Sequence, residues 1–257
     1  IRPDIITPAA ATRVHVHKHD HATVREQTLY QQRHAAVKTW QRANQVNTAI
    51  GTPPTQKKLG IIAVGKAVIE TLEALDILGV TAPADQGIGV FSVAMPYPLD
   101  GSMMVDFAQG YENILVIEEK RSFVEDQLAR ILINLPNPPR LMGKLDKDGA
   151  ELIPQYGELT CETLTNIIGA CATDIGLGSS PGDHAPDLGN LPTVATRTPY
   201  YCAGCPHNSS TKLPDGAITG MGIGCHSISG FLTPDAITNF TQMGGEGAFW
   251  IGRAPFS

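Results

Sequence analysis

The 257-residue chain has room for one large domain or two modest ones, and its 42% hydrophobic and 17% charged residues are typical of a globular protein. A formal net charge of −6 argues against a general nucleic-acid binder, because such affinity rests on clustered Lys and Arg. No apolar run approaches the ~20 residues that span a bilayer, so we expect no membrane partner.

The two ends and the cysteines suggest a piece of a cytoplasmic protein. The chain opens on Ile1 without a recognisable signal peptide and stops at Ser257 inside a glycine-rich stretch, so we expect a longer parent. Five cysteines are an odd number, and two of them form a Cys-x-x-Cys pair. Without a secretory signal, this usage favours a reducing compartment, with ligand or redox roles rather than a disulfide framework.

Residues 1–58 are polar, rich in His and Gln, and weakly patterned. A helix is expected from about His21 to Asn47, and the Gly-Thr-Pro-Pro run at residues 51–54 then indicates a linker. Four histidines alternate just before the helix, and an extended strand would place them on one face as a metal patch. Their polar neighbours favour a solvated segment instead. These histidines are His15, His17, His19 and His21.

Residues 59–140 alternate short apolar strands with helices. Strands are expected at Leu59–Val64, Ile88–Val93 and Ile114–Ile117. Helices are expected at Lys66–Leu78 before a Gly79 cap, at Ser102–Gln109 between Asp100 and Gly110, and from Val124 to Leu135. Because strands that alternate with helices form βαβ units, the predicted fold class is α/β, with a parallel sheet covered by helices.

Two further regions complete the expected organisation. Residues 141–196 form a connecting segment, with a helix at Cys161–Ala172 and a loop rich in Gly, Pro and Ser at residues 176–190. Residues 197–257 begin a second domain that is dense in Gly and Cys, as expected where the backbone approaches a cofactor closely.

The strongest chemical signal is a Cys-Ala-Gly-Cys-Pro-His-Asn turn, in which Cys202 and Cys205 point two thiols the same way. Cys225 adds a third thiol in Gly-Ile-Gly-Cys-His, after another glycine turn. Three such thiols suit a [4Fe-4S] cluster whose fourth ligand comes from elsewhere. Zinc would accept the same thiols with His207 or His226, and a pair of reduced structural cysteines is the third alternative.

Two other stretches are weaker signals. In the Met-Gly-Gly-Glu-Gly run at residues 243–247, glycines let backbone N–H groups turn toward a diphosphate, although such runs are more often plain turns. Neither a P-loop nor a Rossmann dinucleotide motif occurs. Charges at residues 118–121, with Glu125 and Asp126, follow the third strand, where an open α/β sheet collects ligands; a charged helix start explains them equally well.

Taken together and in this order, these motifs resemble bacterial, large-chain indolepyruvate ferredoxin oxidoreductases, a family of thiamine-diphosphate-dependent 2-oxoacid oxidoreductases. Residues 200–212, 222–226 and 241–256 are similar to the start of that family's diphosphate-binding domain. Residues 59–66, 116–127 and 143–159 are similar to its middle domain, which resembles the C-terminal domain of transketolase. The resemblance thus implies a transketolase C-terminal-like parallel sheet domain followed by a truncated thiamine-diphosphate-binding α/β domain.

The resemblance also implies a chemistry. Enzymes of this family oxidatively decarboxylate an aryl 2-oxoacid to an acyl-coenzyme A and pass electrons through iron-sulfur clusters to ferredoxin. It implies a [4Fe-4S] cluster on Cys202, Cys205 and Cys225, and a tentative catalytic role for His226. The positions implied around thiamine diphosphate are Gly204, Pro206, His207, Asn208, Gly224, His226, Gly244, Gly245, Glu246 and Gly247.

The departures from the family pattern limit what this chain is expected to do alone. The magnesium-binding Gly-Asp-Gly with a following Asn has no equivalent; the Pro-Asp-Gly at residues 214–216 lacks the Asn. The pyrimidine-binding domain and a separate ferredoxin-like cysteine cluster are also missing. We therefore expect an inactive fragment that needs the remaining domains or subunits of an oligomeric parent. The alternative is a zinc-binding or assembly module without catalysis, and the 2-oxoacid side chain is not specified.

Overall fold

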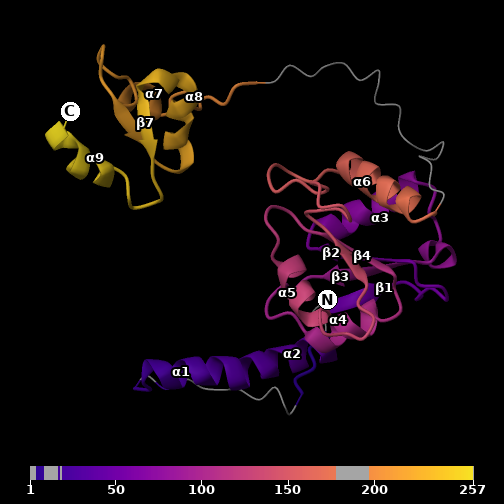
Figure 1. Cartoon of the computed structure of the whole chain (residues 1–257). Coiled ribbons are helices and arrows are strands. Elements are labelled where there is room, and N and C mark those ends of the chain that lie inside the picture. Colours follow the sequence, from indigo (N-terminus) through magenta and orange to yellow (C-terminus); the bar gives the residue numbers. More distant parts are fainter. Residues whose placement is uncertain (1–3, 9–16, 18, 178–196, 257) are drawn as a thin grey trace. The chain divides into compact units, whose positions relative to one another are not determined.

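The computed structural model describes residues 4–8, 17, 19–177 and 197–256, which separate into two compact units (Figure 1). The first unit is Ile1–Asp187 and the second is Leu188–Ser257. We call the first the sheet unit, after its five-stranded sheet, and the second the cysteine unit, after Cys202, Cys205 and Cys225.

The sheet unit confirms the predicted α/β class. Its strands lie in the order β1-β3-β2-β4-β5, and every pair except β1 with β3 is parallel. The central strands are continuous apolar runs because both of their faces are buried, as parallel sheets require. Their bounds are Asn47–Ile50 (β1), Leu59–Val64 (β2), Ile88–Val93 (β3), Asn113–Ile117 (β4) and Arg140–Met142 (β5).

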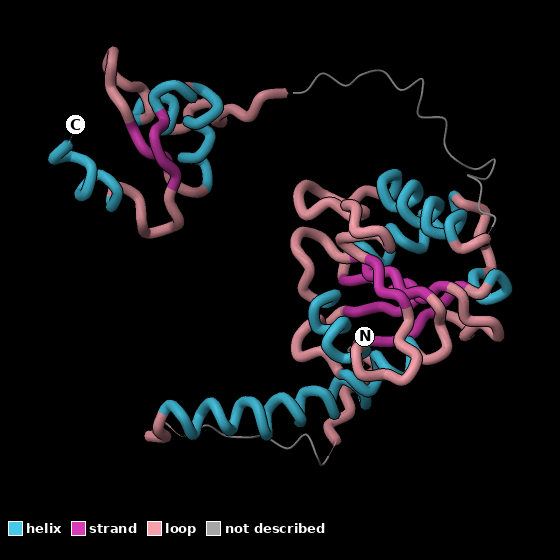
Figure 2. The backbone as a smooth tube through the Cα atoms, in the orientation of Figure 1, coloured by secondary structure: helices cyan, strands magenta, loops and turns pink. Residues whose placement is uncertain are grey.

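Helices cover both faces of this sheet (Figures 1 and 2). Helices α3 (Ala67–Ile77) and α6 (Cys161–Asp174) pack together on one face, over a core that includes Leu59, Ile61 and Ala63. Helices α4 (Gly101–Ala108) and α5 (Val124–Leu132) pack on the other face. Alternate residues of β2 thus feed two separate cores, as the two-residue period of a strand requires.

The helix expected from His21 to Asn47 forms, but it ends earlier. It consists of α1 (Ala22–Thr28), the π-helical turn η2 (Leu29–Arg33) and α2 (His34–Ala43). Within it only Gln41 is fully buried, and its side-chain amide donates to the Pro98 carbonyl at 3.1 Å. The chain then reverses through Gln45 at φ +48° and enters β1, an edge strand that we did not predict.

Asn47 explains why this short strand docks. Its Oδ1 atom accepts hydrogen bonds from the amides of Ala94 and Met95, and its Nδ2 atom donates to the Met95 carbonyl. A buried Asn with three such bonds fixes β1 against the end of β3. These hydrogen bonds join residues nearly 50 positions apart, so no local sequence pattern predicts them.

Local signals elsewhere were reliable. The predicted limits of β2 and β3 are correct to the residue, Gly79 ends α3 at φ +74°, and Asp100 caps α4 by accepting from the Ser102 amide. A small 3-10 turn, η3 (Pro83–Gln86), precedes β3. Of the loop expected at residues 176–190, positions 178–190 lie outside the described residues. No helix in the described part of the chain is both long and apolar enough to cross a membrane.

The cysteine unit is built from short elements around one parallel pair of strands, β6 (Thr219–Met221) and β7 (Ile237–Phe240). Its longest helix, α9 (Ala248–Arg253), follows the glycine run at residues 244–247. The other elements are α7 (His207–Ser210), η5 (Gly224–Ile228), α8 (Ser229–Leu232), η6 (Pro234–Ala236) and η7 (Ala254–Phe256).

Candidate cofactor site

The Cys-x-x-Cys motif forms a tight turn. The amide of Cys205 donates to the carbonyl of Cys202 at 3.1 Å, and Gly204 takes a left-handed φ of +74° that other residues rarely adopt. Both thiols are free; Cys202 is exposed and Cys205 half-buried. Pro206 then starts α7, and the Asn208 side-chain amide donates back to the Cys202 carbonyl at 3.0 Å, which closes the turn.

His207 is held against this turn from two sides. Its Nδ1 atom lies 3.2 Å from the Cys205 Sγ atom, within hydrogen-bonding distance. Its ring stacks on Tyr201, with the two ring centroids 5.3 Å apart. Tyr201 is buried, and its hydroxyl has no partner among the described residues. The Cys205 thiol and the His207 imidazole are therefore held together, and the Tyr201 ring stacked on His207 carries the hydroxyl without a partner.

The structure does not gather the three predicted cluster ligands into one group. Cys225 lies in η5, after Gly224 at φ +71°, and its side chain is exposed. Among residues 17, 19–177 and 197–256, no three His, Cys, Asp or Glu side chains are placed to hold a metal ion. In the arrangement seen here, the three cysteines therefore do not form a preassembled cluster site.

Among the described residues, the alternating histidines form no metal site. His15 lies outside the described residues, and His17 and His19 are exposed. His21 instead caps α1, because its Nδ1 atom accepts a hydrogen bond from the Thr23 amide at 3.3 Å. A helix-capping role thus accounts for one member of the patch.

A pocket of about 320 Å³ opens beside β6, β7 and α9, within the cysteine unit. His226 lines it, and its Nδ1 atom accepts from the Gly222 amide at 3.1 Å. A ring nitrogen that accepts carries no proton, so the neutral imidazole holds its proton on Nε2 and can donate there. Thr241 also lines the pocket; it is buried, and its hydroxyl has no partner among the described residues.

The glycine run at residues 244–247 reaches the pocket, which Glu246 and Gly247 line. Gly244 and Gly247 take left-handed φ angles of +83° and +81°. The carboxylate of Glu246 accepts from the Gly244 amide at 2.7 Å, so an anionic oxygen already occupies one donor of the loop. Gly222 permits this approach, because a Cβ atom there would lie 2.5 Å from the Glu246 Cγ atom. The loop's geometry and the unpaired Thr241 hydroxyl both fit a ligand with phosphate oxygens.

The charged residues after β4 prove to be mainly a helix start. The buried Glu118 carboxylate accepts from the amides of Phe123, Val124 and Glu125 at 2.9–3.0 Å and so satisfies the first turn of α5. The Lys144 ammonium donates to the Glu118 carbonyl oxygen. Burial is the largest influence on both neighbouring groups: it raises the pKa of Glu125 and lowers the pKa of Lys144.

Lys66, which follows β2, forms an ion pair with Glu158, a residue about 90 positions later in the sequence. This pair lies at the carboxyl ends of the parallel strands, as Glu118 does. The Lys66 ammonium lies 2.6 Å from Glu158 and 2.7 Å from Glu70, with Glu119 at 3.8 Å. The hydrogen bonds to Glu158 and Glu70 raise the pKa of Lys66 above its usual range. Sequence reasoning gave no role to Lys66 or Lys144; the only local signal was that each follows a glycine just after a strand.

Comparisons with known proteins show the family of this chain. The family model described as "Indolepyruvate oxidoreductase domain" matches residues 49–183, just over half of the chain and most of the sheet unit. The chain is 26% identical to the indolepyruvate oxidoreductase subunit IorA of Methanothermobacter marburgensis over 66% of its length. It is 28% identical to the Pyrococcus abyssi subunit of that name over 75% of its length. The chain spans 24% and 29% of these relatives' lengths.

Among solved structures, the chain is similar to a split-gene transketolase described as an inactive tetramer, with 19% identity and a TM-score of 0.35. That match covers 49% of this chain and 41% of the transketolase chain. The chain is also similar to the 2-oxoglutarate:ferredoxin oxidoreductase of Magnetococcus marinus, with 13% identity and a TM-score of 0.38. Here the match covers 59% of this chain and 24% of the other.

Proposed function

Because this chain belongs to the indolepyruvate oxidoreductase domain family, we propose that it is part of a 2-oxoacid:ferredoxin oxidoreductase acting on indolepyruvate or another aryl 2-oxoacid. The observation that carries the proposal is the family match across the sheet, from β1 through α6. In this proposal the reaction releases carbon dioxide, yields an acyl-coenzyme A and sends electrons to ferredoxin. The enzyme is an assembly in the cytoplasm, completed by other domains or subunits, and this chain is inactive alone.

We propose that the cysteine unit forms one wall of a thiamine diphosphate site. When bound, this cofactor supplies a carbanion that adds to the substrate ketone and accepts the electron pair left by carbon dioxide. The loop of Gly244, Gly245 and Gly247 would surround the diphosphate, and the Gly244 amide would bind it by displacing the Glu246 carboxylate. The Gly245 amide already donates to the Gln242 carbonyl at 2.9 Å and shapes the turn. The further positions proposed around the cofactor are Gly204, Pro206 and Asn208 on the Cys-x-x-Cys turn, and Gly224 on the second glycine turn.

Three side chains of the cysteine unit carry out the polar chemistry of this proposal. The Nε2–H of His226 donates to an oxygen in the pocket, where it stabilises developing negative charge. The Thr241 hydroxyl, buried without a partner among the described residues, gains one from a phosphate oxygen. His207 stays beside Cys205 and orients its thiol. Magnesium would bind together with the diphosphate; the family's Gly-Asp-Gly motif does not occur in this sequence.

We propose a more specific role for the three cysteines, as ligands of an iron-sulfur cluster. Cys202 and Cys205 would be the first ligands of a [4Fe-4S] cluster, and Cys225 would join them when the enzyme assembles with its fourth ligand. The support is two free thiols on one turn and a third on a second glycine turn. A second candidate, a colourless zinc or assembly module, is favoured by the contact between Cys205 and His207, since zinc accepts thiolate and imidazole together.

Fluorescence of Trp250, which lines the pocket, tests the cofactor proposal. The chain has two tryptophans, so a Trp40→Phe background leaves Trp250 as the sole reporter. Thiamine diphosphate with magnesium should quench this signal saturably, and Thr241→Val should weaken binding about tenfold through loss of one buried hydrogen bond to a charged ligand. Thiamine without its phosphates is the control. Equal binding of both compounds would contradict the loop's role.

A further inference from the structure

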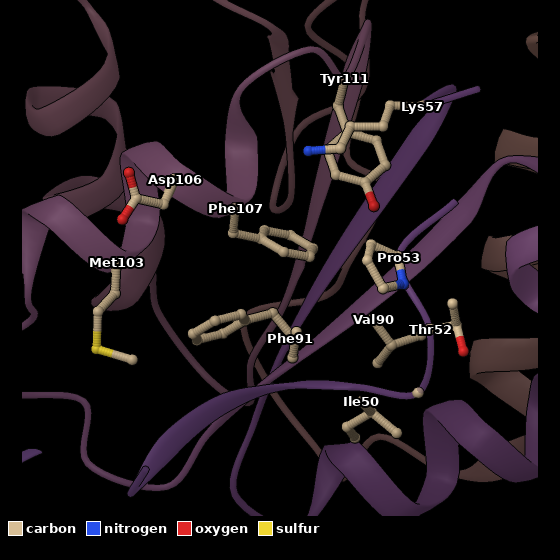
Figure 3. Close-up of a pocket in the computed structure, with 13 residues that line it drawn as sticks. Ile50, Thr52, Pro53, Lys57, Val90, Phe91, Met103, Asp106, Phe107 and Tyr111 are labelled. Carbon is tan, nitrogen blue, oxygen red and sulfur yellow. The ribbon is translucent and has the colours of Figure 1, made fainter. Parts of the chain in front are cut away.

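The sheet unit has a second cleft, at the edge opposite the charged cluster and not used by the proposed function (Figure 3). Lys57 precedes β2, Gly89 lies near the start of β3 and Tyr111 precedes β4, so the cleft lies at the amino ends of the parallel strands. Its volume is about 310 Å³. That size is at the low end of the ~300–1,000 Å³ typical of small-molecule sites, so its ligand must be small.

Aromatic rings form a continuous wall of this cleft. The rings of Phe91 and Phe107 lie 5.1 Å apart between their centroids, and those of Phe107 and Tyr111 lie 5.2 Å apart. In Figure 3 the two phenylalanine rings lie between Met103 on one side and Pro53 on the other. Phe91 and Tyr111 are buried, so the partly buried Phe107 ring is the aromatic surface that a ligand can reach. A ring that two other rings hold in place favours a flat aromatic ligand over an aliphatic one.

One cation stands beside this wall. The Lys57 ammonium donates to the Gln109 carbonyl at 2.8 Å and lies 5.0 Å from the centroid of the Tyr111 ring. These two contacts hold the ammonium at the cleft, where it has N–H donors left for an anion. Burial raises the pKa of Tyr111 to about 12, so its hydroxyl stays neutral and does not compete as an anion.

The Asp106 carboxylate lies at the end of the cleft away from Lys57. The Asp106 side chain is exposed and has no hydrogen bond or ion pair with any residue that the structure describes. In Figure 3 it lies with Met103, across the phenylalanine rings from Lys57. A ligand with one negative charge is attracted to the Lys57 ammonium at one end of the cleft. A second anionic group would lie near the Asp106 carboxylate at the other end and would be repelled by it.

We infer that this cleft binds a small aromatic monocarboxylate. The ring lies against Phe107, and the carboxylate accepts hydrogen bonds from the Lys57 ammonium. The site is independent of the proposed thiamine diphosphate pocket, because every residue that lines it belongs to the sheet unit.

Calorimetric titration of the full chain with 3-phenylpropionate tests the inference. We expect saturable binding at one site, with a dissociation constant on the order of 1 mM or tighter for so small a ligand. 3-Phenylpropionamide, which lacks the charge, and 3-cyclohexylpropionate, which lacks the aromatic ring, should each bind about three- to fivefold more weakly. Absence of saturable binding, or equal binding of all three compounds, overturns the inference.

Two variants locate the site. Lys57→Met keeps most of the alkyl stem but removes the cation, and should weaken 3-phenylpropionate about three- to fivefold. Asp106→Asn removes a like charge and should leave binding unchanged or strengthen it. Unchanged thermal melting of each variant shows that the fold persists. Wild-type affinity in Lys57→Met, or equal weakening by both variants, places the ligand elsewhere and overturns the assignment.

Discussion

Replacing Glu118 with glutamine should lower the free energy of unfolding of the sheet unit, although the two side chains have nearly the same size and shape. In the native chain Glu118 Oε1 accepts from the amides of Phe123 and Glu125, and Oε2 accepts from the amide of Val124. A glutamine keeps one oxygen and presents an N–H₂ group where the other was. The Val124 amide is then buried against a second donor and loses its partner.

The expected magnitude follows from two losses. A buried donor left without an acceptor costs about 1–3 kcal/mol. Removing a negative charge from the first turn of α5 costs about another 0.3–1 kcal/mol through the helix dipole. Together these give a loss of about 2–4 kcal/mol in the free energy of unfolding, a large share of the ~5–15 kcal/mol typical of a domain.

Urea unfolding monitored through Trp40 measures this loss, because Trp40 lies in the sheet unit; a Trp250→Phe background silences the other unit. The matched control is Glu119→Gln, the same change at the next residue. The Glu119 side chain is 35% exposed, 3.8 Å from the Lys66 ammonium and 3.3 Å from the Leu159 amide, so its replacement should cost less than about 1 kcal/mol. Equal losses in the two variants, or a loss below about 1 kcal/mol for Glu118→Gln, would refute the capping argument.

Three further changes probe other parts of the chain. Gly89→Ala should cost about 1–3 kcal/mol by overpacking, since a Cβ atom there would lie 1.8 Å from the Tyr111 hydroxyl, whereas Gly101→Ala meets only Ile131 at 3.6 Å and should cost less; urea unfolding compares them. Burial raises the pKa of Glu125, so its contribution to stability is present at low pH and is lost as the pH rises through the folded-state pKa. Glu125→Gln should therefore flatten the pH dependence of unfolding above about pH 4, and an unaltered profile would contradict this. After anaerobic reconstitution of the assembled enzyme, Cys225→Ser should lower bound iron while Cys161→Ser, a helix cysteine, should not; equal iron in both would count against the cluster.

The sequence predicted the sheet well because its central strands are buried on both faces. Burial of that kind forces uninterrupted apolar runs such as Leu59–Val64, and a local pattern is then sufficient. Strand β1 has no such run; only one of its four residues, Asn47, is fully buried. Its place in the sheet depends on pairing with β3 and on the Asn47 bonds to Ala94 and Met95, which are contacts distant in sequence. Edge strands of this kind leave little trace in a single sequence.

The chemistry was predictable only as residue types, not as contacts. Spacing identified the Cys202 and Cys205 turn, and the structure adds that His207 rather than Cys225 is the near neighbour of the Cys205 thiol. Glycine content identified the loop at residues 244–247, but not that Glu246 folds back onto its own amide. Such details depend on the positions of side chains brought together by turns, where a shift of one ångström changes the partner.

Glu246 also affects how the proposed site would bind its ligand. A carboxylate on the Gly244 amide is a competitor for any phosphate oxygen that approaches the loop. Its attachment is also local, since donor and acceptor are two residues apart, so releasing it requires only a side-chain rotation. Glu246→Gln weakens this competitor without removing the loop. If the loop binds diphosphate, this variant should bind thiamine diphosphate more tightly than the wild-type chain in the Trp250 titration, whereas weaker binding would show that Glu246 holds the cofactor instead of excluding it.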